Sequence, residues 1–185
     1  MPLKLINRAD IAEYRQISET VYDNVLNQQI LDAQRIDLVN LMGAEFYNDL
    51  IRNSTDANYV TLLDGGDYTY NNTPYTNYGL KAVLVHYTYS RYVLFGDQTD
   101  TPFSFVTKTN ENSTPVSTEA KKTTSKNNEQ VAFNYWENVQ LFLERNKDDY
   151  PLYKSCLIPQ TRSFKFSKIG GNDNRVYDKY YKRYI

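Results

Sequence analysis

His86 is the only histidine of the 185-residue chain, so acid–base or nucleophilic chemistry that needs a histidine must use it. It lies inside an apolar stretch, residues 78–95, which is typical of a histidine that packs in a core or an interface. No serine or cysteine with the neighbours of a nucleophile elbow accompanies it. A hydrolase that uses His86 is one alternative function. It predicts that the variant His86→Ala keeps the fold but loses catalytic turnover.

The other residues with chemical potential lack the spacing that metals and cofactors require. Cys156 is the single cysteine, which excludes an internal disulfide framework and a zinc site built on cysteines. Asp148 and Asp149 stand just before a proline and are typical of a solvated helix end. Residues 63–66 (LDGG) lack the Lys-Ser/Thr of a phosphate-binding loop, and residues 169–171 (IGG) lack the spacing of a dinucleotide-binding loop. We therefore predict no catalytic residue, no metal, no cofactor and no enzyme.

The charge of the chain is divided unevenly. The net charge is −1, and residues 153–185 hold eight basic and two acidic residues, a charge of +6, so residues 1–152 carry −7. An acidic body with a basic tail favours contact between copies or with an acidic partner. Basic and aromatic residues alternate over residues 162–168, which would also suit phosphate contact and base stacking. A nucleic-acid-binding accessory protein is therefore the alternative function, although the sequence pI is 5.9 and no nucleic-acid-binding signature is present.

Aromatic residues are abundant, with 18 Tyr, 8 Phe and 1 Trp. Tyrosine buries its ring while its hydroxyl stays in water, which suits surfaces where chains meet; compositional drift in an AT-rich genome is a compatible explanation. The N-terminus turns polar after a few residues, unlike a signal peptide, and no apolar stretch reaches the length of a membrane span. We expect a soluble protein without membrane contact, made in a reducing compartment.

Apolar periodicity predicts three main helices. The first covers residues 22–52, in which Gly43 marks a kink or a break. The second covers residues 78–95, is apolar on most of its circumference and ends at Gly96. The third is clear over residues 129–146. The apolar stripe of the first helix consists of Leu31, Leu38, Met42 and Phe46.

Capping residues predict two further helix starts. A short helix near the N-terminus is capped by Asn7 or Asp10. Residues 113–126 are either an exposed loop or the start of the third helix, with a cap at Ser117 or Thr118.

Polar stretches connect the helices. Residues 56–78 contain Asp-Gly and Asn-rich turn signals and five tyrosines, which predicts a long inserted loop that binds or wraps a neighbour. Residues 97–126 predict a second loop or arm insertion, in which residues 101–109 alternate enough for a strand or an extended arm. Residues 153–185 predict an extended basic and aromatic arm, with a strand over residues 162–168.

Together these elements predict a mainly α fold: a small helical bundle over residues 1–152 with a long inserted loop, an extended C-terminal arm and, as an option, a short β-hairpin. The arm has few aliphatic residues for a core of its own, so we expect it to dock onto a partner. A chain truncated after Gln160 should then fold but fail to join that partner. The candidate interface residues of the loop and the arm are Tyr68, Tyr70, Tyr75, Phe164, Phe166, Tyr177, Tyr180 and Tyr181.

Several stretches occur in an order that is found in a known group of proteins. They are residues 10–15 (DIAEYR), 30–34 (ILDAQ), 37–50 (DLVNLMGAEFYNDL), 59–66 (YVTLLDGG) and 79–91 (GLKAVLVHYTYSR). The chain resembles the head–tail connector (adaptor, or ring) proteins of Bacteroidetes phages, including the crAss-like phages, and more distantly the helical adaptors beneath the portal of long-tailed phages. The resemblance covers about residues 8–95, is looser through residues 135–136 and 150–153, and ends at about residue 160.

The resemblance implies a structural virion protein at the portal–tail junction, in the neck of the particle, made in the host cytoplasm. Such a protein forms a homo-oligomeric ring, commonly twelvefold, that contacts the portal protein and other connector or tail proteins. DNA would pass through the lumen of the ring without tight binding. An acidic body suits such a channel, because tight DNA binding needs clustered lysine and arginine.

Overall fold

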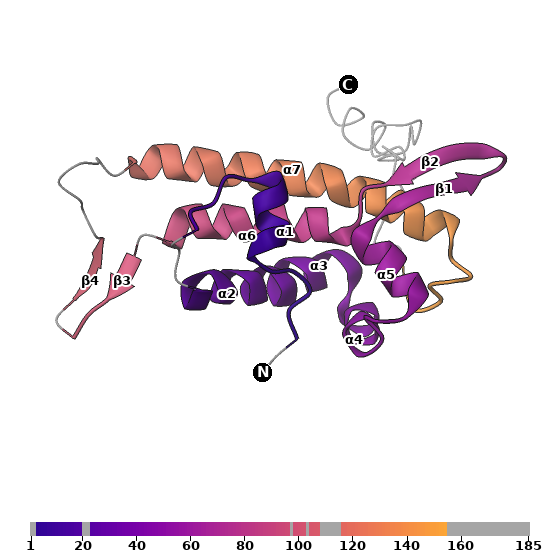
Figure 1. Cartoon of the computed structure of the whole chain (residues 1–185), viewed down its shortest axis with the longest axis horizontal. Coiled ribbons are helices and arrows are strands. Elements are labelled where there is room, and N and C mark those ends of the chain that lie inside the picture. Colours follow the sequence, from indigo (N-terminus) through magenta and orange to yellow (C-terminus); the bar gives the residue numbers. More distant parts are fainter. Residues whose placement is uncertain (1–2, 20–22, 97, 103, 108–115, 155–185) are drawn as a thin grey trace, which may run out of the picture. The chain divides into compact units, whose positions relative to one another are not determined.

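The computed structural model describes residues 3–19, 23–96, 98–102, 104–107 and 116–154, and this part of the chain is mainly helical with two antiparallel hairpins (Figure 1). The predicted mainly α fold is thus confirmed, together with the optional short β-hairpin. The strand predicted at residues 162–168 and the rest of the C-terminal arm lie outside the described residues. In the described ranges, every helix is too short or too polar to cross a membrane.

A capping box begins the first helix, α1 (Arg8–Tyr14). The side-chain oxygen Oδ1 of Asn7 accepts a hydrogen bond from the backbone N–H of Ala9 at 2.7 Å, and the backbone N–H of Asn7 donates to Oδ2 of Asp10 at 2.7 Å. Each of these bonds satisfies a backbone donor that the first turn leaves without a helical partner. Asn7 is therefore the cap, and Asp10 supports it from the third helical position.

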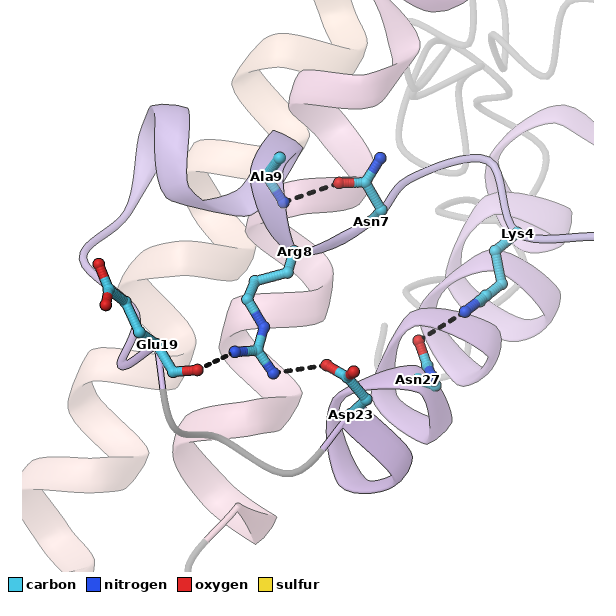
Figure 2. Close-up of polar contacts among 7 residues, drawn as sticks. All are labelled: Lys4, Asn7, Arg8, Ala9, Glu19, Asp23 and Asn27. Atoms are coloured by element: carbon cyan, nitrogen blue, oxygen red, sulfur yellow. Dashed lines mark hydrogen bonds and ion pairs between the residues drawn. The ribbon is translucent and has the colours of Figure 1, made fainter.

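The N-terminal segment is tied to the next helix through polar side chains (Figure 2). Arg8 donates hydrogen bonds to the carbonyl oxygen of Glu19 and to the carboxylate of Asp23. Nζ of Lys4 donates to Oδ1 of Asn27 at 2.8 Å. These contacts lie at the exposed edge of the segment, so they orient it while burial of apolar residues holds it in place.

The helix predicted over residues 22–52 is divided into four segments. They are α2 (Asp23–Asp32), the π-helical η1 (Ala33–Asp37), α3 (Leu38–Met42) and α4 (Ala44–Arg52). Gly43 separates the last two with φ +83°, a conformation that a side chain disfavours, so it is a break and not a kink. The π-helical turn adds a residue to the helical repeat and shifts the buried face, which leaves Leu31 only half-buried. The other members of the predicted stripe are buried: Leu38, Met42 and Phe46.

Residues 56–78 do not form the predicted long loop. They form α5 (Ala57–Asp64) and a hairpin of β1 (Gly66–Tyr70) and β2 (Thr73–Asn77). A tyrosine and two leucines at helical spacing, Tyr59, Leu62 and Leu63, are buried on one side of α5. The hairpin turns at two asparagines with φ of 50° and 60°, the left-handed pair that a two-residue type I′ turn requires. The turn signal at the two asparagines corresponds to a real turn, but the prediction of a long loop is wrong, because the turn closes a tight hairpin.

Two long helices, α6 (Leu80–Phe95) and α7 (Thr118–Arg145), lie side by side in Figure 1 and pack along much of their length. α6 ends at Gly96 as predicted. Oγ of Ser117 accepts from the backbone N–H of Ala120 at 3.2 Å, so Ser117 is the cap and the third helix has the earlier of its two possible starts. A small hairpin of β3 (Gln98–Asp100) and β4 (Phe105–Thr107) connects the two helices.

The core lies between this helix pair and the segments α1 to α5. Tyr153 is also buried, with its ring centroid 5.4 Å from that of Phe46 and 6.5 Å from that of Trp136, so the helical unit extends to the end of the described chain. The largest fully buried apolar side chains are Phe46, Ile11, Leu26, Ile30, Leu38, Met42, Leu50, Leu62, Leu80, Leu84 and Leu143.

Candidate protein–protein interface

Three of the predicted interface tyrosines meet on one face of the β1–β2 hairpin. Tyr68 and Tyr75 are directly opposite each other in the register, and their rings stack with centroids 5.7 Å apart. Tyr70 lies two residues along β1 from Tyr68, and alternate residues of a strand share a face. The pairing of the strands therefore brings together side chains that the sequence separates by a turn.

Arg145, near the end of α7, completes this group. Its guanidinium carbon lies 3.8 Å from the ring centroid of Tyr75, 5.1 Å from that of Tyr70 and 6.0 Å from that of Tyr68. Nη1 donates a hydrogen bond to the hydroxyl oxygen of Tyr68 at 2.9 Å, which is the main cause of the raised pKa of Arg145. We call Tyr68, Tyr70, Tyr75 and Arg145 the hairpin cluster.

The hairpin is fixed to α7 by an amide clamp. Nδ2 of Asn138 donates to the carbonyl oxygen of Thr76 at 3.0 Å, and its Oδ1 accepts from the backbone N–H of Tyr78 at 2.9 Å. The ring of Tyr68 also packs edge-on against Phe142 at 5.0 Å. Because Asn138, Phe142 and Arg145 lie at helical spacing, one face of α7 supports the whole hairpin.

The hairpin cluster is accessible to a partner. Tyr70 and Tyr75 are 39% and 36% exposed. Among the described residues, the only hydrogen-bond acceptor of Arg145 is Tyr68, which leaves further N–H donors of its fork for a partner. Tyrosine and arginine are, with tryptophan, the residue types enriched at energetically important interface positions. A guanidinium held by aromatic rings loses little freedom on binding.

The sequence predicts the three tyrosines of this cluster as interface candidates but does not predict Arg145. The sequence signal for Arg145 is its helical spacing from Asn138 and Phe142, which places a cation on the face of α7 that the hairpin covers. That face can be recognised only after the position of the hairpin is known. The remaining candidates lie outside the described residues: Phe164, Phe166, Tyr177, Tyr180 and Tyr181.

His86 makes the contacts of a packing histidine. It is 3% exposed, its ring stacks on Tyr135 with centroids 5.1 Å apart, and its Nδ1 accepts a hydrogen bond from Nε of Arg15 at 3.3 Å. Burial, and then the charge of Arg15, lower the pKa of His86 to about 4, so the ring is neutral at pH 7. Since Nδ1 is the acceptor, the proton is on Nε2, and interaction with Asn128 partly opposes the lowering of the pKa.

A pocket near the N-terminal segment is lined by charged side chains that already have partners. This shallow pocket of about 210 Å³ lies between the N-terminal segment, α5 and the start of α6. Its lysines are already engaged, Lys81 with Asp64 at 2.5 Å and Lys4 with Asn27. Over the part of the chain that the structure describes, no group of three His, Cys, Asp or Glu side chains could hold a metal ion.

A family model described as a family of unknown function (DUF6712) matches residues 38–163, more than half of the chain. The matched range includes the β1–β2 hairpin, α6 and α7. No curated protein and no solved structure matches the chain.

Proposed function

The chain belongs to the DUF6712 family of unknown function, and we propose that it is a non-enzymatic structural protein that assembles with copies of itself through the hairpin cluster. The observation that carries this proposal is the position of Arg145 against three tyrosine rings on an exposed hairpin face. Rings and guanidinium are held in place before any partner arrives, so little conformational entropy is lost when a partner binds.

The specific role that we propose is that of a subunit in a head–tail connector ring of a tailed phage, at the portal vertex of the virion. The resemblance of residues 8–95 to connector proteins supports this role. A helical body with a projecting hairpin is a suitable ring subunit, because head-to-tail contacts between copies close a ring when their rotation permits it. The portal protein and other connector or tail proteins are the proposed partners, and the net charge of −7 over residues 1–152 suits a lumen through which DNA passes without tight binding.

The proposal is tested by measuring the mass of the purified chain, alone and with portal protein, by native mass spectrometry and light scattering. We expect a ring-sized oligomer, twelvefold if the resemblance holds in full, in at least one of the two samples. Replacing Tyr70 and Tyr75 together by serine should reduce assembly. Phe95→Ser is the matched control, because Phe95 is 46% exposed at the end of α6 and lies outside the cluster.

A chain that stays monomeric at every concentration, with and without portal protein, would contradict the proposal. DNA binding by the isolated chain that weakens steeply as salt rises would favour the nucleic-acid-binding alternative.

A further inference from the structure

A second surface of α7 carries two exposed apolar side chains on either side of a carboxylate. Phe133, Glu137 and Leu141 follow one another at intervals of four residues, so they form one stripe along the helix. Phe133 is 43% and Leu141 48% exposed, and Glu137 is exposed between them. Among the described residues nothing forms a hydrogen bond or ion pair with Glu137. We call these three residues the α7 stripe.

The α7 stripe does not point toward the hairpin of its own copy. Consecutive residues of an α-helix are about 100° apart around the axis, and Asn138, which clamps the hairpin, directly follows Glu137. The hairpin therefore covers one face of α7 and leaves the stripe uncovered by it. Glu137 and Arg145 are eight residues apart, about 12 Å along the axis, whereas ion pairs within a helix form at three or four residues. Arg145 cannot pair with Glu137 of its own copy.

The hairpin cluster and the α7 stripe complement each other in chemistry. The cluster offers an arginine with N–H donors to spare between exposed tyrosine rings. The stripe offers an exposed carboxylate between exposed phenylalanine and leucine side chains. Arginine binds a carboxylate through two parallel N–H···O bonds, and the flanking rings and apolar side chains would exclude water from that ion pair.

We propose that the hairpin cluster of one copy docks on the α7 stripe of a second copy, with Arg145 of the first paired to Glu137 of the second. This inference rests on the self-assembly proposed above and names the surface that receives the hairpin. The two surfaces share no residue, although they adjoin where Arg145 follows Leu141 by four residues. The contact that we propose is head-to-tail: each copy receives one neighbour on its stripe and docks its cluster on another, as in a cyclic ring.

The test exchanges the charges of Arg145 and Glu137. We expect R145E and E137K, each alone, to weaken self-association about 30-fold or more, because each places like charges opposite one another in a desolvated contact. The double variant R145E/E137K should assemble again. An equimolar mixture of the two single variants should also assemble, since alternating copies then meet a native pair at one junction and a swapped pair at the next.

The controls carry the same charge changes at exposed positions outside both surfaces. They are Lys147→Glu for R145E and Asp148→Lys for E137K, and both should assemble like the wild type. Circular dichroism establishes that each variant is folded. Since no described residue pairs with Glu137, E137K tests the contact even where R145E loosens the hairpin.

Each result separates this inference from the proposed function. Assembly of the wild type that E137K leaves unchanged, or that the double variant and the mixture fail to restore, overturns the inference and leaves self-assembly standing. A wild type that is monomeric both alone and with portal protein overturns both. Loss in the single variants with recovery in the double variant and the mixture supports both.

Discussion

Arg91 of α6 and Asp37 of the π-helical turn η1 form an ion pair with two hydrogen bonds. Nε of Arg91 donates to Oδ2 of Asp37 at 2.8 Å, and Nη2 donates to Oδ1 at 2.9 Å. Both side chains are mostly buried, with 25% and 19% exposed, and the hydrogen bond to Asp37 is the main cause of the raised pKa of Arg91. The pair joins the irregular part of the first helical segment to the central helix of the fold.

Removal of the Arg91–Asp37 pair should destabilise the protein. We expect Asp37→Ala to lower the free energy of unfolding by about 2 kcal/mol, because the guanidinium stays in a mostly buried site without its acceptor. Lys154→Ala is the control: Lys154 and Glu45 form an ion pair at 2.6 Å with side chains 77% and 58% exposed. That change should cost less than about 1 kcal/mol. Equal losses in urea denaturation would contradict this prediction.

The side chain of Gln34 holds the N-terminal segment in place. It is 1% exposed, its Oε1 accepts from the backbone N–H of Leu5 at 3.0 Å, and its Nε2 donates to the carbonyl oxygen of Leu3 at 3.0 Å. Gln34→Met keeps the volume but leaves backbone groups without partners, at a cost of about 1–3 kcal/mol. Amide hydrogen exchange at Leu5 should then accelerate. Gln28→Met on exposed α2 surface should not change it, and an unaltered exchange rate in Gln34→Met would argue against this role.

The base of the β1–β2 hairpin depends on two glycines in close backbone contact. A Cβ atom at Gly65 would lie 2.5 Å from the carbonyl oxygen of Asn77, and one at Gly79 would lie 2.6 Å from the carbonyl oxygen of Leu63. Gly43 has φ +83°, close to the +83° of Gly65 and the +81° of Gly79, but nothing lies within 4 Å of its Cβ position. We expect Gly43→Ala to cost about 1–3 kcal/mol from backbone strain alone, because φ +83° with ψ +153° is a conformation that essentially only glycine adopts.

Gly65→Ala and Gly79→Ala should each cost clearly more than Gly43→Ala, since the backbone at the hairpin base must also move. Urea denaturation measures the difference in the free energy of unfolding. Self-association should also weaken in both variants, because the hairpin is then displaced from its position. Three equal losses of stability would show that close approach at the base is unimportant.

Stability should depend on pH through His86. Its pKa is about 4 in the folded protein against 6.5 for an unperturbed histidine, so the unfolded state binds the proton more readily. The stabilisation is complete above pH 6.5 and is lost as the pH falls toward 4, with a total of about 3 kcal/mol. Carboxylates titrate in the same range, so the comparison is with His86→Gln, whose free energy of unfolding should fall less between pH 7 and pH 4.5. Parallel curves for the two proteins would contradict the prediction.

The sequence alone predicts the helix caps, ends and interruptions that depend on residues close together along the chain. The cap at Asn7 or Asp10, the cap at Ser117 or Thr118, the interruption at Gly43 and the end of α6 at Gly96 follow from the conformations of a few successive residues. The structure decides for Asn7, for Ser117 and for a break at Gly43. The wrong prediction of a long loop over residues 56–78 also comes from local signals. Turn signals at both ends of a short helix and a tight hairpin resemble those of one long loop, and only burial of the α5 leucines distinguishes them.

The candidate interface likewise has one part that the sequence predicts and one part that only the tertiary structure reveals. The tyrosine-rich composition of residues 56–78 was sufficient to select Tyr68, Tyr70 and Tyr75 as candidates from the sequence. The tertiary structure alone placed Arg145 over Tyr75, seventy residues away along the chain, and Arg91 against Asp37. Such pairs depend on how helices and hairpin pack, which is set by the whole core and by no local pattern.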